Sequence, residues 1–261
     1  MRIALGLEYD GRQYNGWQSQ AGGNTVQDAV EYALGIVADH PVRVHCAGRT
    51  DSGVHATAQI LHFDTVAQRP VTAWVRGVNS KLPENIAVRW AQSVNDDFHA
   101  RFSARARRYR YLLLNRAQRP GLLNGRVGWY HRVLDIQAMQ SAATLLLGEH
   151  DFSAFRAAEC QAKSPVKTLS ISKLSCHKDL FIFDFEANAF LQHMVRNLVG
   201  SLIHVGKGAE PVGWLSSVLA SRDRARAAAT FCASGLYFAG VDYDSAFGLP
   251  KVGADETALL F

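Results

Sequence analysis

The sequence has only four cysteines among its 261 residues, and they lie far apart, at Cys46, Cys160, Cys176 and Cys232. No two of them form a C-x-x-C pair, and no histidine accompanies them at the spacing of a metal site. This scarcity excludes a disulfide-stapled fold and a zinc site of the usual pattern. We therefore expect reduced thiols, and the sequence indicates neither a metal nor another cofactor.

Long apolar runs are also missing. No stretch of about 18 apolar residues occurs, so no transmembrane helix is predicted. The opening segment MRIALGLEYDG has too short an apolar part for a secretory signal. A soluble, cytoplasmic protein is expected.

Negative charge is in deficit, with 23 acidic against 28 basic residues and a formal net charge of +5. Five arginines fall within one ten-residue stretch: Arg101, Arg105, Arg107, Arg108 and Arg110. Such a cluster suits a polyanionic partner, nucleic acid among them. A solvated arginine face is an equally simple interpretation.

Two successive runs of strand and helix patterns indicate the fold class. Each run has the order β-α-β-β-α-β, which is typical of a ferredoxin-like unit. The first run is expected near residues 3–9, 25–37, 42–47, 57–64, 71–78 and 86–90. The second is expected near residues 107–114, 135–146, 168–176, 180–187, 189–205 and 235–243. We predict an α+β protein with two ferredoxin-like halves and largely antiparallel sheets.

The predicted domain boundary lies after the first run, giving domains at 1–105 and 106–261. Three stretches with little strand pattern, 10–24, 115–134 and 148–165, exceed usual connection lengths and are candidate binding loops. The first contains Trp17 among turn residues, which predicts an exposed tryptophan on a contact loop.

The segment from Cys46 to Ala56 is the loop whose residue types most suggest a catalytic role. It places Arg49 and Asp51 among small and polar residues between two predicted strands. An aspartate between glycines is more often a turn former than a catalyst, so these residues alone leave the role of Asp51 open. No second histidine or acid stands where it would complete a triad with His55, which we interpret as structural.

Aromatic and basic residues alternate in Arg108-Tyr109-Arg110-Tyr111. Strand geometry places both tyrosines on one face and both arginines on the other, so one face suits a base and the other suits phosphates. The alternative is that the tyrosines are core residues. Arg196 lies at the margin of an apolar helical stripe, where we expect either a carboxylate partner or a packed stem with its head in water.

Together these segments resemble the tRNA pseudouridine synthase A family. The signature is Gly48-Arg49-Thr50-Asp51 followed by Gly53-Val54-His55. Further similar blocks follow in the family's order over nearly the whole chain: Leu7-Glu8-Tyr9-Asp10-Gly11, Gly16-Trp17-Gln18, Phe98-His99-Ala100-Arg101-Phe102, Arg108-Tyr109-Arg110-Tyr111, Gly148-Glu149-His150-Asp151-Phe152, Met194-Val195-Arg196-Asn197 and Gly235-Leu236-Tyr237. The departures are small, with Ser52 where the family often has alanine and no proline just before Gly235.

The resemblance implies a pseudouridine synthase fold with a cleft between two domains, a homodimer, and tRNA as substrate at uridines 38, 39 and 40 of the anticodon stem-loop. It implies that Asp51 is the catalytic aspartate, that Tyr109 is the active-site tyrosine, and that Arg196 is the basic partner of Asp51. Arg49 matches the arginine associated with the flipped-out nucleotide.

RNA contacts are expected from the contact loop and the arginine cluster, at Trp17, Arg101, Arg105, Arg108 and Arg110. Two rival functions remain open: a pseudouridine synthase that acts on another RNA position, and a non-catalytic RNA-binding protein. A glycoside hydrolase is disfavoured, because that class usually needs a second carboxylate and none is marked here.

Overall fold

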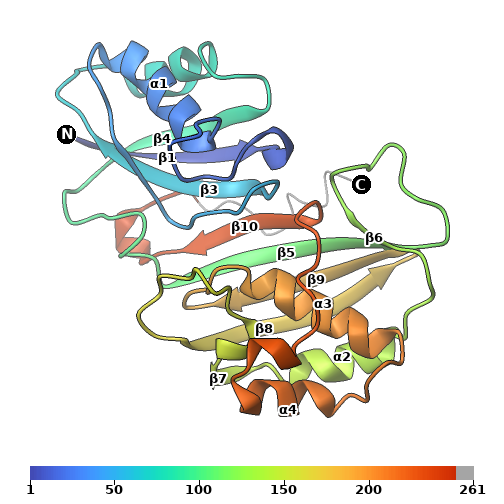
Figure 1. Cartoon of the computed structure of the whole chain (residues 1–261). Coiled ribbons are helices and arrows are strands. Elements are labelled where there is room, and N and C mark those ends of the chain that lie inside the picture. The colour runs from blue at the N-terminus through green and yellow to red at the C-terminus, as the bar shows by residue number, and fades with distance from the viewer. Residues whose placement is uncertain (251–261) are drawn as a thin grey trace. The chain divides into compact units, whose positions relative to one another are not determined.

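The computed structural model describes residues 1–250 (Figure 1). Its helices and mostly antiparallel strands confirm the predicted α+β class. The chain divides into two compact units: unit 1 comprises Met1–Arg107 together with the chain from Tyr237 onward, and unit 2 comprises Arg108–Leu236. Within residues 1–250, no helix is long and apolar enough to span a bilayer.

Unit 1 is built around strand β3. The strands are β1 (Arg2–Tyr9), β2 (Val44–Cys46), β3 (His55–Asp64), β4 (Ile86–Val94) and β10 (Leu236–Asp242). Antiparallel β1 lies between β3 and β4. The other edge of β3 pairs with two strands, β2 and β10. Antiparallel β2 pairs with its far end, Cys46 opposite Leu61, and parallel β10 pairs with its start, Tyr237 opposite His55.

Helix α1 (Val26–Ala38) begins where the sequence predicts it. The Thr25 hydroxyl caps the helix by accepting the backbone N–H of Asp28 at 3.2 Å. Its apolar side, with Val30 and Leu34, is fully buried. The second predicted helix contains a π-helical segment, Ala73–Gly77, whose Trp74 packs edge-to-face on Phe63 at 5.2 Å.

Unit 2 has the strand order β5-β9-β8-β7, with β6 parallel to β5. The strands are β5 (Ala106–Asn115), β6 (Gly128–Tyr130), β7 (Gly148–Asp151), β8 (Val166–His177) and β9 (Leu180–Ala187). The helices are α2 (Ile136–Thr144), α3 (Met194–Gly206) and α4 (Trp214–Ser221), and α2 contacts both β8 and α3 (Figure 1). Short 3-10 helices occupy Gly11–Gln13, Ser153–Phe155, Arg224–Arg226 and Ser245–Phe247.

Four features differ from the predictions. Helix α3 begins at Met194 rather than near 189, because His193 has a left-handed φ of 62° that an α-helix cannot contain. The short strands β6 and β7 lie in stretches predicted to be loops, and α4 was not predicted. The final strand, expected in the second domain at 106–261, clusters with unit 1 through its pairing with β3. Residues 251–261 of that expected domain lie outside the described residues.

Candidate active site

Asp51 lies in the loop between β2 and β3, residues 47–54, which we call the Asp51 loop. Side-chain and backbone groups of β3 hold its first half: Ala47 N–H donates to the Ile60 carbonyl at 2.7 Å, and the Gln59 amide donates to the Gly48 carbonyl at 2.7 Å. Its second half closes as a turn, in which Val54 N–H donates to the Asp51 carbonyl at 3.2 Å. Asp51 is thus carried on irregular backbone with defined hydrogen bonds.

A second loop, residues 10–18, braces the Asp51 loop. Trp17 N–H donates to the Thr50 carbonyl at 3.0 Å, and the Ser52 hydroxyl donates to the Tyr14 carbonyl at 3.2 Å. Gly16 stands at the closest approach, with a φ of 91°, and a Cβ there would lie 2.7 Å from the Thr50 carbonyl oxygen. The brace therefore requires glycine for both conformation and space.

Trp17 is buried, with 1% of its surface exposed, so the prediction of an exposed tryptophan is wrong. Its ring lies 6.0 Å from that of Tyr9, which is also buried. The Tyr9 hydroxyl is 2.8 Å from the Thr50 hydroxyl, and burial raises the pKa of Tyr9 above its ordinary value. Trp17 and Tyr9 are thus buried residues that support the Asp51 loop at Thr50.

His55, at the start of β3, is buried and fully engaged, in agreement with a structural role. Its Nδ1 lies 3.2 Å from the Gly11 N–H and 3.2 Å from the Asp10 carboxylate, and its ring stacks on Tyr237 at 4.7 Å. Burial raises the pKa of Asp10, but interactions with His55 and Arg12 outweigh this effect and hold that pKa well below its usual range. His55 therefore ties the 10–18 loop to β3 and β10.

In unit 2, Tyr109 and Arg196 lie on regular elements. Tyr109, on β5, is nearly buried, and its ring meets Phe190 edge-to-face at 5.0 Å. Arg196, on the first turn of α3, donates from Nε to the Phe231 carbonyl at 2.9 Å, and Phe231 N–H donates back to the Arg196 carbonyl at 3.2 Å. The guanidinium is thus oriented by one backbone segment, residues 224–231, which we call the strap.

Asn197, beside Arg196 on α3, fastens the strap. It is completely buried, and its Nδ2 donates to the Phe155 carbonyl at 2.7 Å. Its Oδ1 accepts the Thr230 hydroxyl at 2.6 Å and the Arg224 guanidinium at 3.2 Å. The strap lies directly on α3, since a Cβ on Gly200 would be 2.2 Å from the Ala229 carbonyl oxygen. Sequence reasoning missed this polar centre.

Tyr111 is a core residue and is buried more completely than Tyr109. Its hydroxyl donates to the Cys232 carbonyl at 3.0 Å, and no part of the side chain is exposed. Burial raises its pKa well above the ordinary value, while the positive charge of Arg196 opposes the shift. Of the two interpretations offered for the tyrosines, the core role holds for Tyr111.

The arginine cluster divides by its partners. Arg108 and Arg110 pair with carboxylates of β9, Glu186 at 2.5 Å and Asp184 at 2.7 Å. Burial raises the pKa of Glu186, but hydrogen bonds from Arg108 and Ser170 lower it below its ordinary value. These two arginines are therefore neutralised inside unit 2, and their contact with RNA stays a prediction.

The remaining predicted arginines lie in unit 1. Arg105 pairs with Asp244, whereas Arg101 is exposed and lies over the Phe102 ring at 5.5 Å. Arg49 is exposed on the Asp51 loop. Arg49 and Asp51 thus lie in unit 1, Tyr109 and Arg196 lie in unit 2, and the pairing of Asp51 with Arg196 stays a prediction.

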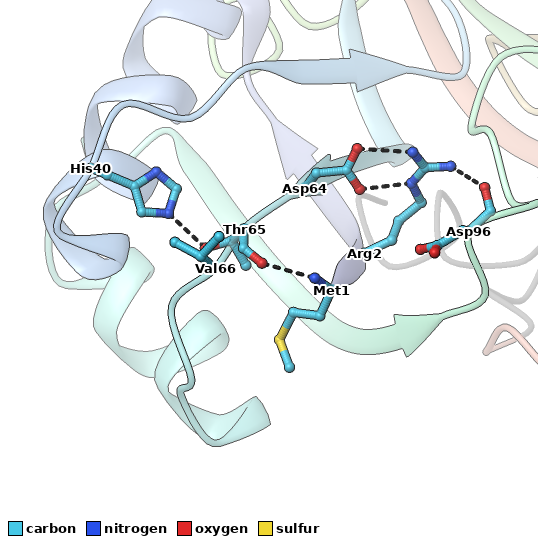
Figure 2. A pocket seen from close by; sticks show the side chains of 7 residues that line it. All are labelled: Met1, Arg2, His40, Asp64, Thr65, Val66 and Asp96. Atoms are coloured by element: carbon cyan, nitrogen blue, oxygen red, sulfur yellow. Dashed lines mark hydrogen bonds and ion pairs between the residues drawn. The ribbon is translucent and has the colours of Figure 1, made fainter.

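A recess near the N-terminus is not a plausible reaction site (Figure 2). It is lined by Met1, Arg2, His40, Asp64, Thr65, Val66 and Asp96. Its polar groups hold one another: Arg2 pairs with Asp64 at 2.8 Å, and the terminal amine donates to the Thr65 carbonyl at 2.9 Å. Across residues 1–250, no group of three or more His, Cys, Asp or Glu side chains is arranged to hold a metal ion.

Several supporting residues escaped prediction because their signal was indirect. Tyr9, Gly16 and Asn197 all occur in the blocks that carry the family resemblance, yet only the structure assigns them roles. Gln59 and Thr230 gave no signal, because a polar residue within a strand or loop pattern predicts no particular partner.

Comparison with known proteins gives a consistent result. The sequence profile described as tRNA pseudouridine synthase matches residues 7–103 and 142–244. A protein named tRNA pseudouridine synthase A from Dechloromonas aromatica is 64% identical over 98% of this chain and 97% of its own length. Proteins of the same name from Aromatoleum aromaticum and Vibrio campbellii are 60% and 55% identical, each over 97% of this chain and 96% of their own length.

Proposed function

Because this chain belongs to the tRNA pseudouridine synthase A family, whose members are isomerases, we propose that it converts uridine to pseudouridine at positions 38, 39 and 40 of the tRNA anticodon stem-loop. The observation that carries the proposal is the 64% identity to a synthase of that name over 98% of the chain. The predicted family membership is confirmed by that match. We also propose that the protein is cytoplasmic, forms a homodimer and binds tRNA.

The reaction breaks the bond between C1′ and N1, turns the freed uracil, and joins C1′ to C5. The C5 proton leaves and N1 gains one, so no electron or energy input is needed. Asp51 either attacks C1′ as a nucleophile or removes the C2′ proton. Either role requires an ionised carboxylate, which a neighbouring Arg196 would favour by stabilising the charged form.

The substrate must leave its stack before it can react. Extrusion of a base costs a few kcal/mol, which pocket contacts must offset. Tyr109 supports the extruded ring in this proposal, and Arg49 occupies the vacated space. Tolerance of three adjacent positions suits recognition by RNA shape rather than by base edges.

The test is pseudouridine mapping of tRNA from cells that lack this protein, complemented with wild type, Asp51→Asn or Glu84→Gln. Glu84 is an exposed carboxylate of the same unit and serves as the matched control. We expect modification at 38–40 to return with wild type and Glu84→Gln only. If Asp51→Asn restores it, Asp51 is not catalytic; if modification persists without the protein, the target assignment fails. Full binding of tRNA without any modification would favour the RNA-binding alternative.

A further inference from the structure

Residues 99–103 of unit 1, here the 99–103 turn, present an aromatic and a basic side chain to solvent. Phe102 is 75% exposed, and the Arg101 guanidinium lies over its ring. A single exposed apolar side chain needs no explanation. Phe102, however, belongs to a contiguous set of rings: His99 lies 4.3 Å from it, and His45, which is exposed, lies 5.3 Å from His99.

The backbone of the turn is held by hydrogen bonds to two histidine rings. His99 Nδ1 accepts the N–H groups of Arg101 at 3.1 Å and Phe102 at 3.3 Å. His62 Nδ1 accepts the Ala100 N–H at 3.1 Å, and burial lowers the pKa of His62 to about 4, which keeps it a neutral acceptor. A surface fixed in advance loses little conformational entropy when a ligand binds.

The Arg107 side chain connects the turn to the Asp51 loop. Arg107 donates to the Ala47 carbonyl at 3.3 Å, at the start of that loop, and to the Arg101 carbonyl. Burial raises the pKa of Cys46 to about 12, and the positive charges of Arg49 and Arg101 both oppose this shift. Both guanidinium groups therefore add positive charge to the region around Cys46.

The charge of this region selects the class of ligand. Within the part of the chain that the structure describes, neither Arg49 nor Arg101 pairs with a carboxylate. An uncompensated guanidinium over a largely exposed aromatic ring suits a ligand that has both a flat ring and a phosphate. A base-paired nucleotide does not offer its ring face, whereas an unpaired one does.

We propose that the 99–103 turn is a second RNA-contact site, where an unpaired nucleotide stacks on Phe102 and Arg101 binds its phosphate. This inference rests on the proposed function, because it takes the RNA bound at the Asp51 loop as the ligand. The site is distinct from the position of the reacting uridine. It contributes to binding and takes no part in bond breaking.

The experiment compares Phe102→Leu with Phe102→Trp in the full chain, with Tyr32→Leu as control. Tyr32 is 69% exposed on α1 and tests the loss of an unrelated surface ring. Since stacking of one base contributes up to a few kcal/mol, we expect Phe102→Leu to weaken tRNA binding and raise KM about tenfold, with kcat nearly unchanged. Phe102→Trp should restore the wild-type affinity for tRNA and the wild-type KM. Tyr32→Leu should leave both quantities unchanged.

Arg101→Gln provides an independent measurement. Loss of one phosphate contact should reduce the slope of log affinity against log salt concentration by about one. The proposal is overturned if Phe102→Leu binds tRNA as wild type does, if tryptophan fails to restore affinity, or if Phe102→Leu changes the sedimentation coefficient, which would assign the face to a second copy of the chain.

The two proposals fail in different ways. If wild type forms pseudouridine and Phe102→Leu leaves KM unchanged, only the contact site is wrong. If wild type binds tRNA but forms no pseudouridine, the proposed function is wrong, and the affinities of the Phe102 variants still decide this inference. Absence of tRNA binding by wild type overturns both.

Discussion

The Asp51 loop and the helix that carries Arg196 are positioned by different means. Asp51 is held on irregular backbone by hydrogen bonds from the 10–18 loop and β3. Arg196 lies on a regular helix and is oriented through one side chain, Asn197, that fastens the strap. Unit 1 thus depends on backbone conformation at its site, and unit 2 depends on a buried polar side chain.

This difference predicts which substitutions each region tolerates. A loop braced by close backbone contacts has no room for added atoms, while a helix site depends on keeping one network satisfied. The variants below test the contrast, beginning with the largest expected effect.

Gly16→Ala should disrupt the Asp51 loop. The new Cβ would lie 2.7 Å from the Thr50 carbonyl oxygen, and alanine disfavours the φ of 91°. Backbone strain of this kind costs about 1–3 kcal/mol, and displacement of Asp51 by about 1 Å should lower kcat about 100-fold. Single-turnover pseudouridine formation and urea unfolding measure the two effects.

Gly22→Ala is the matched control in the same connection. No atom lies within 4 Å of a Cβ at Gly22, and its φ is not left-handed, so both activity and stability should stay at the wild-type level. If Gly16→Ala retains wild-type kcat, the Asp51 loop does not depend on the brace, and the contrast between the units is wrong.

Asn197→Leu should loosen the strap. It leaves the Thr230 hydroxyl and the Phe155 carbonyl without their partner, which costs about 2–4 kcal/mol of unfolding free energy. Under the proposed pairing of Arg196 with Asp51, a displaced guanidinium would stabilise the carboxylate less, so kcat should fall about tenfold. A merely structural role would lower stability and leave kcat of the folded enzyme unchanged.

Ser201→Ala tests the same helix one turn later. Ser201 is fully buried, and its hydroxyl has no hydrogen-bond partner among residues 1–250, so alanine should be neutral or slightly stabilising. Equal losses for Asn197→Leu and Ser201→Ala would show that α3 tolerates no substitution, and the special role of Asn197 would be lost.

Acidification should weaken unit 1 through His62. Burial, with nearby His99, Arg2 and His45, lowers its pKa from 6.5 to about 4, and Asp64 opposes this. The unfolded chain therefore binds the proton first as pH falls, and stability decreases between pH 6.5 and 4, by about 1–2 kcal/mol from pH 7 to pH 5. Urea unfolding at both pH values should show this loss, and His62→Gln should remove it. An unchanged pH dependence in that variant would assign the loss to other groups.

The sequence predicts regular elements well where their local chemistry is complete. Thr25 and Asp135 cap the two helices expected to start at these residues, and Phe181, Phe183 and Phe185 share one buried face of β9. The start of α3 was misjudged because nothing in the residue type of His193 signals a left-handed φ. Local pattern places an element but does not set every boundary.

At the candidate site, residue types indicated the Asp51 loop, but the residues that support it could not be found. Trp17 was placed outside because turn residues surround it, whereas packing on Tyr9 buries it. The partners of Arg108 and Arg110 come from β9, which lies far away in sequence. Contacts of this kind depend on tertiary structure, which no local pattern contains.

Because β10 completes the edge of β3, the order of synthesis on the ribosome matters. Residues 1–107 emerge first, but Tyr237, which stacks on His55, is translated only after all of unit 2. A message truncated before codon 236 would encode the whole Asp51 loop without the strand that pairs beside its end. Nascent and prematurely terminated chains would therefore carry the Asp51 loop in an unfinished domain until β10 has been synthesised.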